Sequence, residues 1–138
     1  MKSRKSIFIK LIIGGFFALL NLTVKSQTVN KRIQTSCKDV YNRTLSYYNK
    51  GQFENIEDNL SNCINEFQNN KKKYTTPGQN VDLVFKVYKL IITSYKNIDK
   101  DNLADEKLDE LQSFVHDIGY TKAEFMQRFD DTSLDFVK

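Results

Sequence analysis

The chain carries a pattern of residues that recurs 48 positions further along. The matched pairs are Tyr47 with Tyr95, Ile56 with Ala104, Leu60 with Leu108 and Cys63 with Leu111. A repeat of this kind indicates two similar supersecondary units, each of which buries its apolar face against its neighbour. We therefore expect two stacked units and not one irregular domain.

The first unit has the apolar periodicity of a pair of helices. Its apolar residues recur at intervals of three and four, which is the stripe of an amphipathic helix. They are Val40, Tyr41, Leu45, Tyr47 and Tyr48, and then Phe53, Ile56, Leu60, Cys63, Ile64 and Phe67. Between these two runs Asn49-Lys50-Gly51 breaks the period, and Gly51 suits the left-handed backbone that ends a helix. The unit is predicted to be a tight helical hairpin.

The second unit begins after a polar stretch. Thr76-Pro77-Gly78-Gln79 has the composition of a helix start, with an N-cap, a Pro at the first helical position and a capping-box Gln. The next helix is apolar around most of its circumference, so we expect it to be the central helix. Its apolar residues are Val81, Leu83, Val84, Phe85, Val87, Tyr88, Leu90, Ile91, Ile92 and Tyr95. A fourth helix is predicted to end at Gly119.

A short fifth helix is predicted from a second capping signal. Thr121-Lys122-Ala123-Glu124 has the spacing of a capping box. The helix that it opens would hold Phe125, Met126 and Phe129 against the open end of the stack. Five helices and no strand are therefore expected.

The first unit resembles the tetratricopeptide repeat. Tyr47, Gly51, Phe53, Ile56, Leu60 and Cys63 stand at the Tyr, Gly, Tyr, Ala, Phe and Ala positions of that repeat. Ile56 departs from the usual small residue, and Ala104 restores it in the second unit. Cys37 ahead of Tyr48-Asn49-Lys50-Gly51-Gln52-Phe53, together with Val87-Tyr88-Lys89-Leu90, is similar to exported tetratricopeptide-like proteins of Bacteroidota cell envelopes. The resemblance implies a helical module that binds other proteins.

We predict an all-α fold of two tetratricopeptide-like helical hairpins plus a short C-terminal capping helix, which is a fragment of an α-solenoid. The hairpins span residues 36–67 and 77–118 and are joined by a linker at residues 68–76, within a helical domain of residues 36–129. Flanking this domain are a signal peptide (1–26), an N-terminal extension (27–35) and an irregular C-terminal tail (130–138) in which Phe136 is expected to dock.

The N-terminus has the pattern of a signal peptide. Met1-Lys2-Ser3-Arg4-Lys5 is basic, and Leu11 to Leu20 is an apolar run of about half the roughly 20 residues that would span a bilayer. Val24-Lys25-Ser26 places small or β-branched residues where a signal peptidase reads them, so cleavage is predicted after Ser26. The alternative is an uncleaved signal anchor over Ile7 to Val24. No Cys follows the apolar run directly, which disfavours a lipoprotein.

Export also changes the charge of the chain. Residues 1–26 hold five of its 21 basic residues and no acid, which leaves 16 basic against 17 acidic residues. A nearly neutral mature chain gives no support for nucleic-acid binding. Contact with a membrane is expected only through an uncleaved signal.

The two cysteines offer a separate check on the first hairpin. Cys37 lies 14 residues before Gly51 and Cys63 lies 12 residues after it, so two helical arms of nearly equal length bring them side by side. Export supplies an oxidising compartment. A disulfide is predicted, with two buried free thiols as the alternative. Two Cys and one His give little support for a metal site.

Residues suited to catalysis do not form a recognisable motif. His116, the sole histidine, lies beside Asp117 near a predicted helix end, where a solvated role is ordinary. Pairs such as Asp105-Glu106, Asp109-Glu110 and Asp130-Asp131 are typical of solvated faces or caps. We predict a non-catalytic adaptor in the cell envelope or outside the cell, without cofactor, metal or small-molecule substrate. A signal-anchored structural subunit of a membrane complex is the alternative, and a small helical enzyme is a third.

A binding groove is implied by the resemblance, because the first helix of each tetratricopeptide unit lines the concave face. The corresponding positions are Lys38, Tyr41, Leu45, Tyr48 and Asn49, and then Lys86, Lys89, Thr93, Lys96 and Asn97. In the second set the three lysines and Thr93 share one helix face. This basic strip is expected to receive an acidic segment or a C-terminal carboxylate of a partner protein, and a solvated polar face is the alternative. Lys71-Lys72-Lys73 is expected to lie in a flexible, solvated linker.

Overall fold

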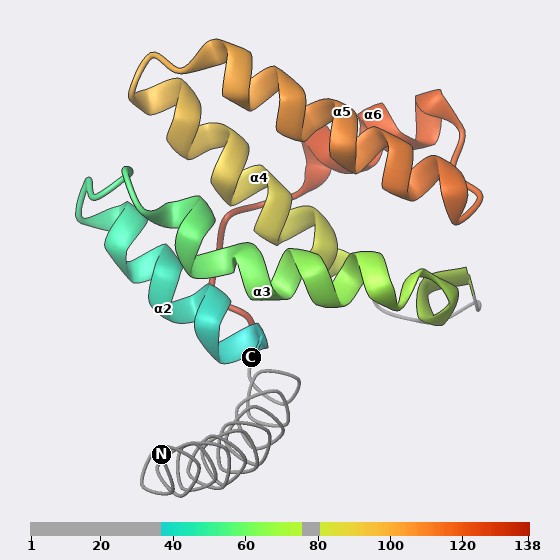
Figure 1. The fold of residues 1–138 in the computed structure, drawn as a ribbon, viewed down its shortest axis with the longest axis horizontal. Helices are drawn as coiled ribbons and strands as arrows, with labels where there is room; N and C mark the ends of the chain where they lie inside the picture. The colour runs from blue at the N-terminus through green and yellow to red at the C-terminus, as the bar shows by residue number, and fades with distance from the viewer. Residues whose placement is uncertain (1–36, 76–80) are drawn as a thin grey trace, which may run out of the picture. The chain divides into compact units, whose positions relative to one another are not determined.

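A computed structural model describes residues 37–75 and 81–138 of the chain. The predicted signal peptide (1–26) and N-terminal extension (27–35), and the predicted helix start Thr76-Pro77-Gly78-Gln79, lie outside the described residues. The described ranges are all-α and contain no strand, which confirms the predicted fold class (Figure 1). The elements are α2 (Cys37–Asn49), α3 (Ile56–Asn69), a 3-10 helix η1 (Lys71–Thr75), α4 (Asp82–Asn97), α5 (Asp101–Asp117) and α6 (Lys122–Asp131).

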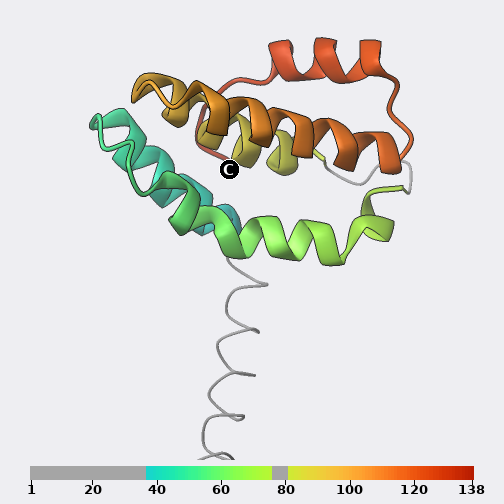
Figure 2. The same cartoon turned by 45° about the horizontal axis from the view of Figure 1, so that its top comes forward.

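The helices form two antiparallel pairs, α2 with α3 and α4 with α5 (Figures 1 and 2). The two pairs close with the same backbone hydrogen bond, from Gln52 N to Tyr47 O at 3.0 Å and from Lys100 N to Tyr95 O at 2.9 Å. Gly51 and Asp99 occupy equivalent places in these turns, with φ of +76° and +57°. Gly119, which follows α5, also has a positive φ, +104°. The repeat in the sequence is therefore also a repeat of turn geometry.

Helix α4 is the central helix, as predicted, because it packs against α2, α3, α5 and α6. Its buried residues are Val84, Phe85, Val87, Tyr88, Leu90, Ile91, Ile92 and Ser94. Ser94 is the one serine in this set, and its hydroxyl donates to Leu90 O at 2.6 Å. Its polar group is therefore satisfied within the helix. Burial on several sides explains why the apolar residues of this helix do not form a single stripe.

A disulfide joins α2 to α3. Cys37 and Cys63 are paired, with their Cα atoms 5.6 Å apart, which is within the usual range for such a bond. Both residues are buried in the core. The pairing agrees with the hairpin register predicted around Gly51, and it fixes the first residue of α2 against the middle of α3.

The predicted linker between the pairs is more ordered than its three lysines suggest. Helix α3 continues past the predicted boundary and η1 follows it. The ring of Tyr74 packs edge-on against Phe67 and Phe114, with centroid distances of 6.0 and 5.9 Å. Lys71 Nζ lies 2.6 Å from Asp117 Oδ2. The Tyr74 ring and the ion pair of Lys71 therefore hold this segment against the helices, although its three lysines alone favour a solvated chain.

Helix α6 packs against α4 and α5. Its start is a capping box, as predicted: Glu124 N donates to Thr121 Oγ1 at 3.2 Å, and Thr121 N donates to Glu124 Oε2 at 2.7 Å. Phe125 is buried and Phe129 is half-buried, whereas Met126 is exposed. The core-facing side of α6 is thus formed by the two phenylalanines.

Candidate peptide-binding face

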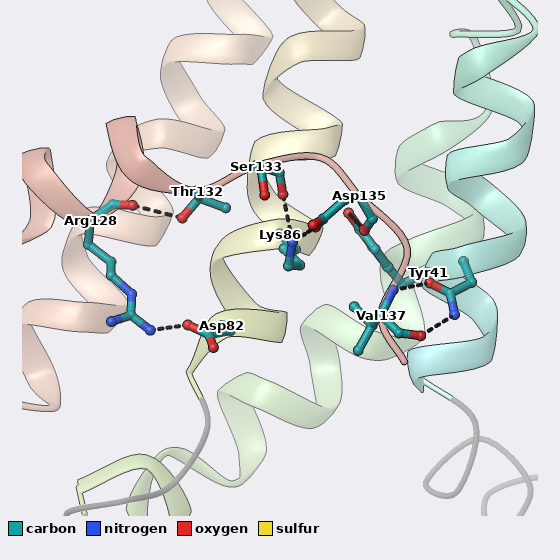
Figure 3. Close-up of polar contacts among 9 residues, drawn as sticks. Tyr41, Asp82, Lys86, Arg128, Thr132, Ser133, Asp135 and Val137 are labelled. Carbon is teal, nitrogen blue, oxygen red and sulfur yellow. Dashed lines mark hydrogen bonds and ion pairs between the residues drawn. The ribbon is translucent and has the colours of Figure 1, made fainter.

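The chain returns from α6 to α2 through residues 132–138, which we call the C-terminal segment. This segment forms neither a helix nor a strand, and it passes α4 before it reaches α2 (Figures 1 and 3). Three side chains receive it: Lys86 of α4, and Tyr41 and Asn42 of α2. We call the surface formed by these three residues the α2–α4 face. It belongs to the first helix of each pair.

The α2–α4 face holds the backbone of the segment at alternate residues. Lys86 Nζ donates to Ser133 O at 2.7 Å. Tyr41 Oη donates to Asp135 O at 3.2 Å, and Val137 is held two residues further on. In an extended chain every second residue repeats the same orientation. The segment therefore presents one edge of its backbone to the helices.

Asn42 binds both backbone groups of one residue. Its Nδ2 donates to Val137 O at 2.9 Å, and Val137 N donates to its Oδ1 at 2.8 Å. A side-chain amide carries a donor and an acceptor, so it can satisfy a backbone N–H and C=O together. These contacts do not involve the side chain of Val137. They are therefore tolerant of sequence.

The contact that depends on sequence is an ion pair between Lys86 and Asp135 (Figure 3). The Lys86 side chain is 15% exposed, whereas that of Asp135 is 65% exposed. The hydrogen bond from Lys86 lowers the pKa of the Asp135 carboxyl below its ordinary value. An ion pair this exposed adds little stability by itself, so its main effect is to favour an acidic residue at this position.

Two apolar residues of the segment pack against the core, but they are not the predicted one. Leu134 and Val137 are half-buried on the core cluster, whereas Phe136 is 55% exposed. The expectation that Phe136 docks is wrong. Phe136 lies between two residues whose backbone groups bind α2, and most of its side chain is in solvent.

Lys89, predicted to bind a ligand, instead caps a helix. Its Nζ donates to Phe129 O at 2.6 Å and to Asp130 O at 3.2 Å, at the end of α6. It also lies 4.9 Å from the centroid of the Phe129 ring. A cation at the carbonyl end of a helix satisfies unpaired acceptors and complements the helix dipole. The structure thus gives Lys89 a role within the fold.

The other predicted groove residues differ in their access to solvent. Tyr41 and Leu45 are buried, Tyr48 and Thr93 are half-buried, and Lys38, Asn49, Lys96 and Asn97 are exposed. Thr93 Oγ1 donates to the carbonyl of its own helix at Lys89, at 2.6 Å. Asn97 Nδ2 donates to Tyr48 Oη at 3.3 Å, which joins the two pairs. Of the ten, the structure brings Tyr41 and Lys86 onto the C-terminal segment.

Tyr41 can act there as a donor throughout the ordinary pH range. Burial, and then the nearby Asp135 carboxylate, raise the pKa of Tyr41 to about 12. The phenol is therefore protonated at neutral pH and can donate to the backbone of the segment.

Two residues of this site were absent from the sequence prediction. Asn42 stands beside Tyr41 on α2, but its partner is a backbone, which leaves no mark in the sequence. Asp135 was assigned to an irregular tail. The signal that points to it is the run Leu134-Asp135-Phe136-Val137, in which an acid stands among apolar residues.

A second polar cluster cross-links α3, α4 and α5. Lys107 Nζ lies 2.7 Å from Glu57 Oε1 and 2.9 Å from Glu110 Oε2. Tyr88 Oη donates to Glu110 Oε1 at 2.8 Å and accepts from Gln68 Nε2 at 3.0 Å. Burial would lower the pKa of Lys107, but the two carboxylates raise it above its ordinary value. Since these groups satisfy one another, the cluster is a structural link between the pairs.

Catalysis, metal binding and membrane spanning each place requirements on the described residues, beginning with the sole histidine. The His116 side chain is 82% exposed and its Nδ1 lies 4.0 Å from Asp117 Oδ1. In residues 37–75 and 81–138, no three His, Cys, Asp or Glu side chains gather as metal ligands would. Among the helices of these same ranges, none has the length and apolar character needed to cross a membrane.

Comparisons of the chain with family models, with curated proteins and with solved structures find no match.

Proposed function

We propose that the protein is an exported, non-catalytic adaptor whose α2–α4 face binds an extended segment of another protein. The observation that carries this proposal is the seating of the C-terminal segment, whose backbone is held by Tyr41, Asn42 and Lys86. A surface that binds a backbone at alternate residues is suited to extended peptides in general.

A tetratricopeptide-like relationship is part of this proposal. Two helix pairs with equivalent turns at Gly51 and Asp99 support it. So does the position of the bound segment, which lies on α2 and α4, the first helix of each pair. In tetratricopeptide folds these are the helices that line the groove.

Export to the cell envelope is supported by two observations. The N-terminal residues have the basic and apolar pattern of a signal peptide. Cys37 and Cys63 are paired, and disulfides persist in oxidising compartments. Mass spectrometry of the native protein tests this part. A mature mass that starts at Gln27 is expected, and a mass that includes residues 1–26 would favour the signal-anchored alternative.

Capture experiments test the binding function. Three full-length proteins are used as bait in an extract of the native envelope. They are the wild type, the double variant Asn42→Ala with Lys86→Ala, and the control variant Lys72→Ala. Lys72 is exposed and lies on η1, away from the α2–α4 face. Bound proteins are expected to be lost with the double variant and retained with the control. Equal capture by the wild type and the double variant would show that the binding surface lies elsewhere.

A further inference from the structure

We propose that the C-terminal segment is an internal ligand of the α2–α4 face, and that the partner displaces it with an extended segment of the same pattern. That pattern is an aliphatic residue, an acid, any residue and a second aliphatic residue, as in Leu134-Asp135-Phe136-Val137. The inference rests on the proposed function, and it names the chemistry of the partner.

The first step is that another chain can make the same backbone contacts. Four hydrogen bonds join the face to backbone groups of Ser133, Asp135 and Val137. Backbone groups are the same in every non-proline residue. A foreign segment in an extended conformation can therefore accept and donate at the same places.

The second step is that the side chains of the segment define a preference. Lys86 favours an acid at the position of Asp135. The half-buried Leu134 and Val137 contact the core, so aliphatic residues are favoured at these two positions. Phe136 is mostly in solvent, so its position accepts many residues.

The third step is that the segment is held loosely enough to be replaced. Thr132 is bonded to the last turn of α6, but residues 133–138 have no helical or strand hydrogen bonds, and four of the seven residues are exposed. Segments with few buried contacts and exposed hydrogen bonds open at a small fraction of the cost of global unfolding. The helices beneath it keep their disulfide and their core when it leaves.

The fourth step is that displacement has a measurable cost. A tethered segment competes at an effective concentration on the order of mM. The apparent association constant for a free peptide is its intrinsic value multiplied by the fraction of molecules whose face is open. A variant with a weakened segment should therefore bind the peptide at least about tenfold more tightly than the wild type does.

The experiment uses a labelled synthetic peptide with the sequence of residues 130–138 and the full-length chain, with binding measured by fluorescence anisotropy. The weakened variant carries Leu134→Ala, Asp135→Ala and Val137→Ala. We expect its Kd for the peptide to be at least about tenfold lower than that of the wild type. Addition of Asn42→Ala to this variant should abolish the gain.

Peptide variants test the pattern. Replacement of the residue equivalent to Asp135 or to Val137 by Ala should weaken binding to the weakened variant severalfold, whereas replacement of the one equivalent to Phe136 should leave it unchanged. Should the triple variant not fold, the full-length Asp135→Ala chain serves instead, because this side chain is largely exposed. Its expected gain in affinity is smaller but in the same direction.

Three outcomes would overturn the inference. One is equal affinity of the folded wild type and the weakened variant for the peptide. Another is binding that survives Asn42→Ala. The third is a concentration-dependent dimer that disappears with Asn42→Ala, since the occupant would then be a second copy of this chain. If the peptide does not bind but envelope proteins are still captured through the α2–α4 face, this inference fails while the proposed function stands.

Discussion

Gly51 and Asp99 stand at the same point of two equivalent turns, 48 residues apart, and both have a positive φ, +76° and +57°. Only the first of these turns uses the residue that adopts this backbone without strain. Left-handed backbone disfavours residues with a Cβ, although Asp tolerates it better than most.

Asp99→Gly is therefore expected to raise the free energy of unfolding by up to about 1 kcal/mol. Gly51→Ala should lower it by about 1 kcal/mol, through backbone strain alone, because a Cβ at Gly51 meets no atom within 4 Å. Urea denaturation measures both. The control is Asp105→Gly, the same substitution on exposed helical backbone of α5, which should be destabilising by roughly 0.3 kcal/mol because Gly has a lower helix propensity than Asp. Equal effects of Asp99→Gly and Asp105→Gly would contradict the assigned turn.

The disulfide is expected to contribute stability on the order of 3 kcal/mol, because it restricts the unfolded chain between Cys37 and Cys63. Addition of a reductant should shift the denaturation midpoint of the wild type down to that of the double variant Cys37→Ser with Cys63→Ser. The double variant itself should not respond to the reductant. A wild-type midpoint that is insensitive to reduction would show that the two thiols are not bonded in solution.

Acid should weaken the docking of the C-terminal segment. The folded pKa of Asp135 lies below its ordinary value of 3.8 because of its hydrogen bond with Lys86. Its contribution to docking is therefore fully present above pH 3.8 and is lost as the pH falls through the lower, folded pKa. NMR signals of the Asn42 side-chain amide and of the Val137 amide should move part of the way toward their undocked positions in this range.

Asp135→Asn is the control for the acid experiment. This variant should lack the transition, because its side chain does not titrate. Asp117 and Glu124 also have lowered pKa values, from Lys71 and from the α6 cap. Neither carboxylate contacts the C-terminal segment. Signals at Asn42 and Val137 therefore report the protonation of Asp135 and not that of Asp117 or Glu124. Identical pH profiles for the wild type and Asp135→Asn would contradict the ion pair.

Loss of the Tyr88 hydroxyl should weaken the link between the helix pairs. Tyr88→Phe leaves Gln68 and Glu110 each without one partner in a partly buried site, at an expected cost of about 1–2 kcal/mol. Tyr47→Phe is the matched control, since Tyr47 is 37% exposed and its ring is not part of this cluster. Its effect should be close to zero. A neutral Tyr88→Phe substitution would mean that water replaces the hydroxyl at no cost.

Sequence reasoning succeeded where one or two neighbouring residues determine the local structure. Gly51 and Gly119 each mark a helix end through a backbone that favours glycine, and Thr121 with Glu124 marks a helix start through reciprocal hydrogen bonds. The cysteine pairing followed from the nearly equal lengths of the two helical arms together with the oxidising compartment that export implies. In each case the structure depends on short-range rules.

The site was harder to predict because its contacts join distant residues through backbone groups. Tyr41 and Lys86 could be proposed from the resemblance to the tetratricopeptide repeat, but nothing in the sequence says that Asn42 meets the backbone of Val137. Phe136 was expected to dock, but Leu134 and Val137 are the residues of the segment that pack against the core. Tyr74 shows the same limit in η1. Its ring packs against Phe67 and Phe114 and orders a segment that its three lysines led us to expect in solvent.

The contact between Asn42 and Val137 also has consequences for the order of folding. Its partners are 95 residues apart in the chain, and the entropy of closing a loop grows with its length. Contacts within each helix pair span far fewer residues and should form sooner. We therefore expect newly folded molecules to pass through a stage in which both pairs are complete before Asn42 binds Val137. The lifetime of that stage sets how often a competing segment arrives before the chain's own.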